Sequence, residues 1–218
     1  MVIVKSLKIP NIKVVERASA LNGDEMELGQ TILWQWHICR KLIDKNAKPI
    51  VLESEIMIER AHTLRGLYYT IPPKKNSMYI TAIRGSAYIN AVDLRDSSGT
   101  YKMADGCEIS AQNQSQIYIP EDFAWGILSL EDNTVLRCMS TNYISAKFTK
   151  VLNYADPHLS ISWPEEPLFV SQKNRMAPGI NELETQIQLE LIHEAELNEQ
   201  LEENAFEEVS VKHEEKKF

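Results

Sequence analysis

Cysteine and histidine are the residues of this chain whose types could carry nucleophilic, acid–base or metal chemistry. Cys138 lies in the alternating run TVLRCMS. A thiol with an ordinary pKa of about 8.5 could act there as a nucleophile or an acid, but we favour a small apolar filler. The five histidines show no metal-ligand spacing and no HxH pattern, and the three cysteines form no CxxC pair. We therefore predict reduced thiols and no metal.

The net charge of −8 comes from the C-terminal end of the chain. Residues 181–218 hold 12 of the 31 acidic and 3 of the 23 basic side chains, so the preceding part is close to neutral. That part lacks the clustered Lys and Arg of a nucleic-acid-binding protein, and we exclude that class. No run approaches the roughly 18 apolar residues of a membrane span, and no signal-peptide pattern is present. We expect a soluble cytoplasmic protein.

Between residues 50 and 150, short apolar or alternating runs are separated by turn signals. Runs rich in Ile, Val, Tyr and Thr that recur about every ten residues predict an antiparallel sandwich or barrel. No GxGxxG or phosphate loop is present, which argues against a dinucleotide-binding domain. The segment TILWQWHICRKLIDK fits a helix as well as a strand, and residues 20–50 stay open. The expected turns lie at Gly85, Asp96–Gly99, Asp105–Gly106, Pro120 and Glu131–Asn133.

The composition changes after Gly179 to a segment without Pro or Gly that is rich in helix formers. We predict a helix from about 181 to 204. Its face of Leu183, Ile187 and Leu191 could dock on a partner or form a coiled coil, but Glu190 and Glu194 interrupt the heptad. We favour a solvated helix with a disordered end, and therefore an acidic helical or partly disordered tail over 181–218.

Several stretches resemble the dTDP-4-dehydrorhamnose 3,5-epimerase family, in the family's own order. Leu64–Tyr69 (LRGLYY) is similar to the family's LRGLHY, and Gln116–Gly126 (QIYIPEDFAWG) to QLWIPEGFAHG. The further matches are Ala91–Arg95 with AVDLR, Ser98–Thr100 with SPT, Ile109–Asn113 with LSAEN, and the later stretches Thr141–Tyr143, Ile161–Pro164 and Ser171–Asn174. The resemblance implies an all-β, cupin-type jelly-roll barrel over residues 1–180, followed by the C-terminal helical extension. It also implies a homodimer and a reaction without a cofactor.

Members of this family remove protons from the carbons beside a 4-keto group and return them on the opposite face. Such a reaction needs a base with a pKa near 7, an acid, and donors for the enolate oxygen. Most positions that the resemblance matches to these roles hold other residue types: Tyr68 for the base, Asn174 for its orienting Asp, Cys138 for the acid, and Trp125 and Met78 for a second His and a Lys.

Two further matches concern substrate contacts. Arg65 and Lys173 are retained at positions that the resemblance assigns to substrate phosphate or nucleotide, although Arg65 could instead be kept for structure, bonding to backbone carbonyls. A Gln and an Asn of the family correspond to Glu53 and Glu55. His62, six residues before Tyr68, could replace the base, but we interpret it as a surface histidine in a connecting loop.

The free-energy cost of these replacements decides whether the reaction is retained or lost. A tyrosine with a pKa of about 10 is ionised to roughly one part in a thousand at pH 7, a deficit of about 4 kcal/mol against a base poised at neutrality. Each lost enolate donor removes about 3 kcal/mol more. These losses indicate that the epimerisation has been abandoned.

We therefore expect a catalytically altered member of the family that binds a nucleotide-linked sugar or a carbohydrate without 3,5-epimerisation. Tyr68 and Trp125 could stack on a ligand ring or plug the pocket. Two alternatives stay open. One is a sugar-nucleotide epimerase or isomerase that uses Tyr68, Cys138 or the Glu53 and Glu55 pair. The other is a scaffold whose acidic tail recruits a protein partner.

Overall fold

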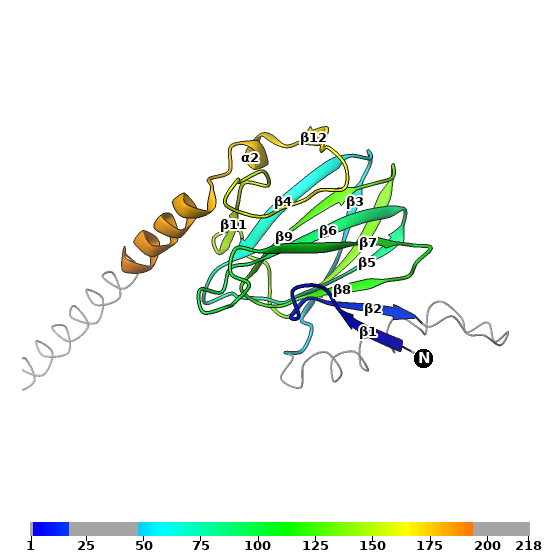
Figure 1. Cartoon of the computed structure of the whole chain (residues 1–218), viewed down its shortest axis with the longest axis horizontal. Coiled ribbons are helices and arrows are strands. Elements are labelled where there is room, and N and C mark those ends of the chain that lie inside the picture. The colour runs from blue at the N-terminus through cyan, green and yellow to red at the C-terminus, as the bar shows by residue number, and fades with distance from the viewer. Residues whose placement is uncertain (1, 18–47, 194–218) are drawn as a thin grey trace, which may run out of the picture. The chain divides into compact units, whose positions relative to one another are not determined.

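The computed structural model describes residues 2–17 and 48–193, which form twelve strands and two helical segments (Figure 1). The open segment TILWQWHICRKLIDK lies outside these residues. The strands are β1 (Val2–Ser6), β2 (Lys13–Arg17), β3 (Leu52–Ile58), β4 (Thr63–Thr70), β5 (Met78–Arg84), β6 (Ser86–Asp93), β7 (Ala104–Ser110), β8 (Gln116–Ile119), β9 (Phe123–Ser129), β10 (Thr134–Ser140), β11 (Thr149–Val151) and β12 (Phe169–Val170). A short helix, α2 (Gln172–Arg175), follows β12.

Two sheets make up the domain. One has the order β1-β2-β8-β5-β10-β3, and the other has the order β11-β4-β9-β6-β7, with β12 added in parallel beside β4. All other pairings are antiparallel, and sequence neighbours such as β4 and β5 lie in different sheets. This arrangement of two sheets with crossing connections is the predicted jelly roll.

The strands form because their side chains alternate between the interior and the outer faces. On β3 every second residue is less exposed, and β10 repeats the pattern until its last residues. The inward side chains of both sheets form one apolar core, which includes Ile80, Ile89 and Ile127. At about 25 cal/mol per Å² of buried apolar area, this core is the main source of the domain's stability.

The turn at Gly85 is confirmed, because this residue has φ +69° and leaves almost no room for a Cβ beside Thr134. The turn predicted at Asp105–Gly106 is wrong, since both residues lie within β7. Gly106 serves close strand contact instead: a Cβ there would lie 2.3 Å from the carbonyl oxygen of Ile89. The local Asp-Gly signal is therefore overridden by pairing with β6.

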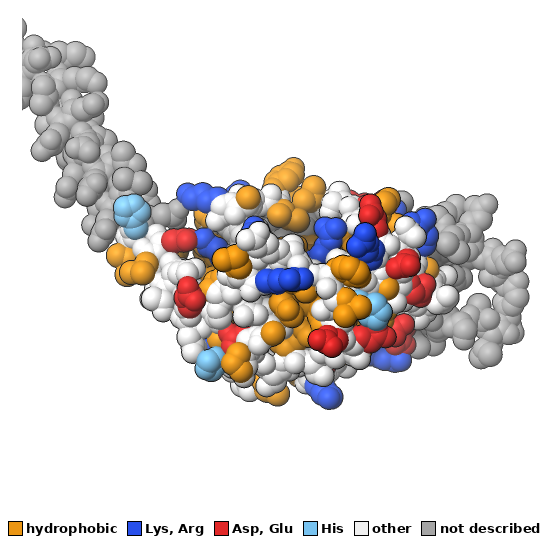
Figure 2. Space-filling model, turned by 90° about the horizontal axis from the view of Figure 1, so that it is seen from above, with side chains coloured by type: hydrophobic (Ala, Val, Ile, Leu, Met, Phe, Trp, Pro, Cys, Tyr) orange, Lys and Arg blue, Asp and Glu red, His pale blue; other side chains and the backbone are white. Residues whose placement is uncertain are grey.

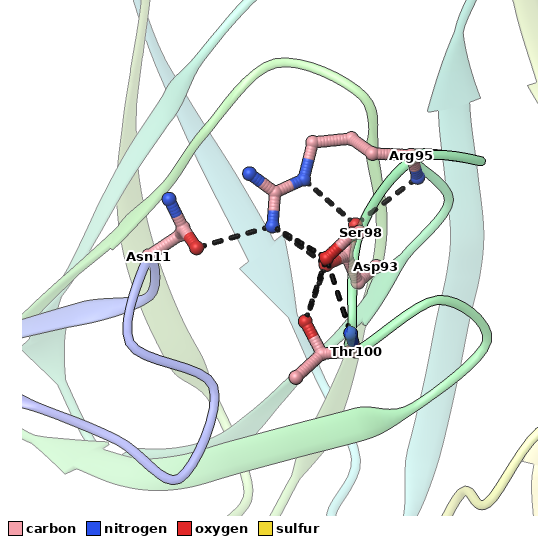
Figure 3. Close-up of polar contacts among 5 residues, drawn as sticks. All are labelled: Asn11, Asp93, Arg95, Ser98 and Thr100. Atoms are coloured by element: carbon pink, nitrogen blue, oxygen red, sulfur yellow. Dashed lines mark hydrogen bonds and ion pairs between the residues drawn. The ribbon is translucent and has the colours of Figure 1, made fainter.

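A polar cluster attaches the loop after β6 to the β1–β2 turn (Figure 3). The fully buried carboxylate of Asp93 accepts hydrogen bonds from Arg95, Ser98 and Thr100, with three distances of 2.6 Å. Arg95 also donates to Asn11 at 3.1 Å and lies 4.8 Å from the centroid of the Phe123 ring. Burial alone would raise the pKa of Asp93, but these hydrogen bonds hold it well below its ordinary value.

The chain divides into two compact units, residues 1–179 and 180–218. In the second unit, residues 180–193 are helical, which agrees with the first part of the predicted helix, while 194–204 lie outside the described residues. Within the helix, Thr185 donates to the carbonyl of Asn181, and Gln186 to Glu182 at 3.1 Å. The acidic, helical or partly disordered character of the whole tail stays a prediction.

Candidate functional site

Tyr68 and Trp125 lie opposite each other on β4 and β9. Their ring centroids are 5.3 Å apart with an interplanar angle of 60°, a tilted arrangement favourable for aromatic rings. Trp125 is 7% exposed and belongs to the apolar core, while Tyr68 is half-buried and packs against it. Burial raises the pKa of Tyr68, and the nearby charge of Arg65 only partly offsets this. The ionised form of Tyr68, which alone could act as a base, is therefore even less populated at pH 7 than in an exposed tyrosine.

Met78 and Cys138 reach the same interior from the opposite sheet. They lie on the neighbouring strands β5 and β10, and each is 2% exposed within the apolar core. Burial raises the pKa of Cys138 to about 12. Its thiol is thus protonated at neutral pH, as expected for a small apolar filler rather than for a nucleophile or a ready acid.

Four of the five positions matched to the proton-transfer groups are therefore brought together, but as packed side chains. Tyr68, Trp125, Met78 and Cys138 all contact one hydrophobic cluster. None of them is ionised at pH 7 with the pKa directions given above. The arrangement resembles a filled core more than an acid–base site.

Asn174, the fifth matched position, lies on α2 and is buried. Its side-chain nitrogen donates to the carbonyl oxygen of Gly66 at 2.6 Å, and its side-chain oxygen accepts from Ser171 at 2.8 Å. Both ends of the amide are thus engaged with the backbone of β4 and the N-cap of α2. Asn174 serves to fasten α2 to β4.

Arg65 and Lys173 are the residues directly before Gly66 and Asn174, the two residues that this hydrogen bond joins. Both are exposed, and in the described part of the chain neither has a carboxylate partner. The one hydrogen bond of Arg65 among these residues runs to the carbonyl of Met57 at a long 3.4 Å. Both cations are therefore available to an anionic ligand.

The face that carries α2 and β12 mixes cations with apolar groups. Figure 2 views the molecule from the side on which these elements lie in Figure 1, and shows Lys and Arg side chains among hydrophobic ones. Three exposed apolar residues of this part of the chain are Leu168, Phe169 and Met176. Arg60 lies 5.1 Å from the centroid of the Phe169 ring.

Glu53 and Glu55 project from the exposed face of β3, and both pair with Arg137 on the adjacent β10, at 2.9 and 3.4 Å. Arg137 is not among the site residues expected from the sequence, although two glutamates spaced two apart on a strand favour a cation on the neighbouring strand. His62, just before β4, lies 2.9 Å from Glu165 and has a half-exposed side chain. Glu53, Glu55 and Glu165 thus each lie within ion-pair distance of a basic side chain.

Within residues 2–17 and 48–193, no group of three or more His, Cys, Asp or Glu side chains is arranged to hold a metal. No helix in the described part of the chain is long and apolar enough to span a membrane. Cys107 and Cys138 are both free thiols, and Cys39 lies outside the described residues.

The two sheets around an apolar interior define a jelly roll of the cupin type, and comparisons with known proteins narrow the class. Residues 32–182 match the dTDP-4-dehydrorhamnose 3,5-epimerase family. The chain is 31% identical over 140 residues to the dTDP-4-dehydrorhamnose 3,5-epimerase of Sinorhizobium fredii, covering 64% of this chain and 72% of that one. It is 34% identical over 128 residues to the enzyme of Methanothermobacter thermautotrophicus, covering 57% and 68%.

Solved structures agree with this assignment. The epimerase of Bacillus anthracis, solved with TDP and PPi bound, has 26% identity and a TM-score of 0.68, covering 83% of this chain and all of that one. The Legionella pneumophila epimerase in complex with dTDP-4-keto-L-rhamnose shares the fold, with a TM-score of 0.69 at 22% identity over 83% and 94%. The chain belongs to the dTDP-4-dehydrorhamnose 3,5-epimerase family, and the predicted family and fold are confirmed.

Proposed function

We propose that this chain is an altered member of its family, which binds a nucleotide-linked sugar, or the nucleotide part of one, without 3,5-epimerisation. The observation that carries the proposal is the apolar cluster formed by the matched positions, in particular the buried Cys138 and Met78. Abstraction of a proton beside a keto group needs an ionisable base and donors for the enolate oxygen. Raised pKa values at Tyr68 and Cys138 work against the role of base. For the enolate oxygen, the thiol of Cys138 is only a weak donor and the thioether of Met78 has no proton to donate.

Binding is supported by the two exposed cations. Arginine suits phosphate oxygens because its planar fork donates two parallel hydrogen bonds, and Lys173 adds a point charge. The relatives solved with TDP and PPi or with a dTDP-sugar bind ligands that carry such phosphates. Retention of Arg65 and Lys173 beside a filled interior is the pattern expected if binding has outlasted the chemistry.

The rival proposal of an isomerase with new catalytic groups has weaker support. Glu53 and Glu55 would have to leave Arg137, and Cys138 would have to ionise from a pKa of about 12. The third proposal, a scaffold acting through the acidic tail, concerns residues mostly outside the described part of the chain. Our proposal also includes a homodimer, a cytoplasmic location, and binding that needs neither a cofactor nor a metal.

Calorimetric titration of the full chain with dTDP-glucose tests the binding. We expect Arg65→Lys and Lys173→Ala each to weaken binding several-fold, because each removes a charge-assisted contact or its bidentate geometry. Lys147→Ala, a lysine change on the loop before β11, is the matched control and should leave the affinity unchanged. Millimolar or weaker binding that neither Arg65→Lys nor Lys173→Ala affects would contradict the proposal.

A further inference from the structure

The Tyr68–Trp125 pair lies between an exposed cation and the closed interior. On β4 and β9, Arg65 is opposite Ile127 and Tyr68 is opposite Trp125, with a register shift between the two pairs. Ile127 and Trp125 both belong to the apolar core, so this row of positions follows the inner face of the sheet. Arg65 is exposed, whereas Trp125 is buried. The aromatic pair therefore marks the boundary between solvent and core along this strand pair.

Behind the aromatic pair, the interior is unsuited to a sugar on two grounds. Met78, Cys138, Trp125 and Ile80 pack into one cluster, so a pyranose ring could enter only by displacing them. These side chains also offer a thioether, a thiol, an aliphatic group and only one good donor, the indole N–H of Trp125, where a sugar would need several hydrogen-bond partners. Buried hydroxyl groups without partners are strongly unfavourable.

Phosphate groups face no such obstacle, because they would stay on the solvent side of the pair. Arg65 and Lys173 are exposed and without carboxylate partners in the described part of the chain. The hydrogen bond between Asn174 and Gly66 fixes the backbone positions next to both cations. An anionic group can thus be held there without any opening of the core.

Resting on the proposed function and making it more specific, we propose that Tyr68 and Trp125 close the barrel to sugars, and that the ligand of this chain is a nucleoside diphosphate recognised through its phosphates. The sugar of a nucleotide-sugar then remains in solvent and adds no affinity. Tyr68 and Trp125 are specificity-determining residues in this account.

Titration calorimetry of the wild-type full chain with dTDP and with dTDP-glucose tests the proposal. The expected result is that dTDP binds as tightly as dTDP-glucose or more tightly, since its terminal phosphate carries additional charge. If dTDP-glucose binds more than about threefold more tightly than dTDP, the sugar is recognised and the inference is overturned, while the proposed binding function stands. If neither ligand binds, the proposed function itself fails and this inference with it.

A pair of variants assigns the effect to the aromatic pair. Tyr68→Ala frees the volume of the half-buried ring, where a sugar could pack against Trp125 without entering the cluster behind it, and should shift the ratio of affinities about tenfold toward dTDP-glucose. Tyr68→Phe keeps the ring without its hydroxyl and should leave the ratio as in the wild type. An unchanged ratio in Tyr68→Ala that folds, as judged by circular dichroism and thermal melting, would exclude Tyr68 as the barrier. If Tyr68→Ala does not fold, the wild-type comparison still decides the inference.

Discussion

Asn174 of α2 donates its side-chain amide to the carbonyl oxygen of Gly66 in β4 across 2.6 Å, over 108 residues of sequence. In the family's motif, the position that matches Asn174 holds an Asp that orients a catalytic His. Here the amide does a different task, because a carboxylate cannot donate to a carbonyl whereas an amide can. The residue type at position 174 therefore fits a structural role beside Gly66 and does not fit orientation of a cationic base.

Substitution of Asn174 should lower the free energy of unfolding. Asn174→Ala leaves the buried carbonyl of Gly66 without its donor, at a cost of about 1–3 kcal/mol. Asn174→Asp should cost more, because it buries a carboxylate against a carbonyl oxygen. Urea denaturation at pH 7 measures both, with Gln172→Ala on the exposed face of α2 as the control. Equal stability of Asn174→Asp and the wild type would contradict the structural role.

The Asp93 cluster should make the domain sensitive to acid. Because the pKa of Asp93 is held below its ordinary value of 3.8, its contribution is fully present above that pH and is lost as the pH falls below it. At pH 7, Asp93→Asn should lower the free energy of unfolding by about 3 kcal/mol, since Arg95 loses its buried partner. Denaturation curves from pH 7 down to pH 3 should show this difference shrinking.

Asp96→Asn is the matched control for this prediction, since Asp96 is exposed in the same loop. It should change the stability by less than about 0.5 kcal/mol at any of these pH values. A difference between Asp93→Asn and the wild type that grows in acid would contradict the assigned direction of the pKa shift.

The thiols of Cys107 and Cys138 should resist alkylation in the folded protein. Burial raises both pKa values to about 12, and at Cys107 the neighbouring charges of Asp105, Glu16 and Glu108 add to the effect. At pH 8 the thiolate fraction is then about a thousandfold lower than at the ordinary value of 9.0. Iodoacetamide labelling followed by peptide mass spectrometry measures this, with urea-unfolded protein as the control.

The same two shifts predict how stability depends on alkaline pH. Because the folded pKa values are raised, the thiols contribute stability that is present below pH 9 and is lost as the pH rises toward 12. In the iodoacetamide experiment described above, fast labelling of Cys138 in the folded protein at pH 8 would contradict its place in the core.

Much of the fold could be predicted from local pattern. The runs AYINAVDL, QIYI and AWGILSL correspond closely to β6, β8 and β9, because alternation and β-branched residues report the pleat directly. The error at Asp105–Gly106 arose because a glycine needed for close strand contact has the same local appearance as a turn glycine. Pairing partners far apart in sequence, such as β4 with β9, could come only from the resemblance.

The candidate site was predictable in its members but not in their contacts. Motif matching identified Tyr68, Trp125 and Cys138, yet whether they line a pocket or fill one depends on side chains from both sheets. The bond from Asn174 to Gly66 joins residues 108 positions apart and has no local signal. Arg137 could have been found from the spacing of Glu53 and Glu55 once β3 and β10 were paired.

Proton exchange at the sugar carbons tests most directly whether the epimerisation has been lost. The full chain is incubated with dTDP-4-keto-6-deoxyglucose in deuterated buffer, and the C3 and C5 proton signals are followed by NMR. A parallel sample with an active epimerase of the family, such as the Sinorhizobium fredii relative, establishes that the substrate is competent. With Tyr68, Cys138 and Met78 in the matched positions, both signals should decline no faster than in the buffer blank. Loss of either signal at a rate well above the blank would contradict the account.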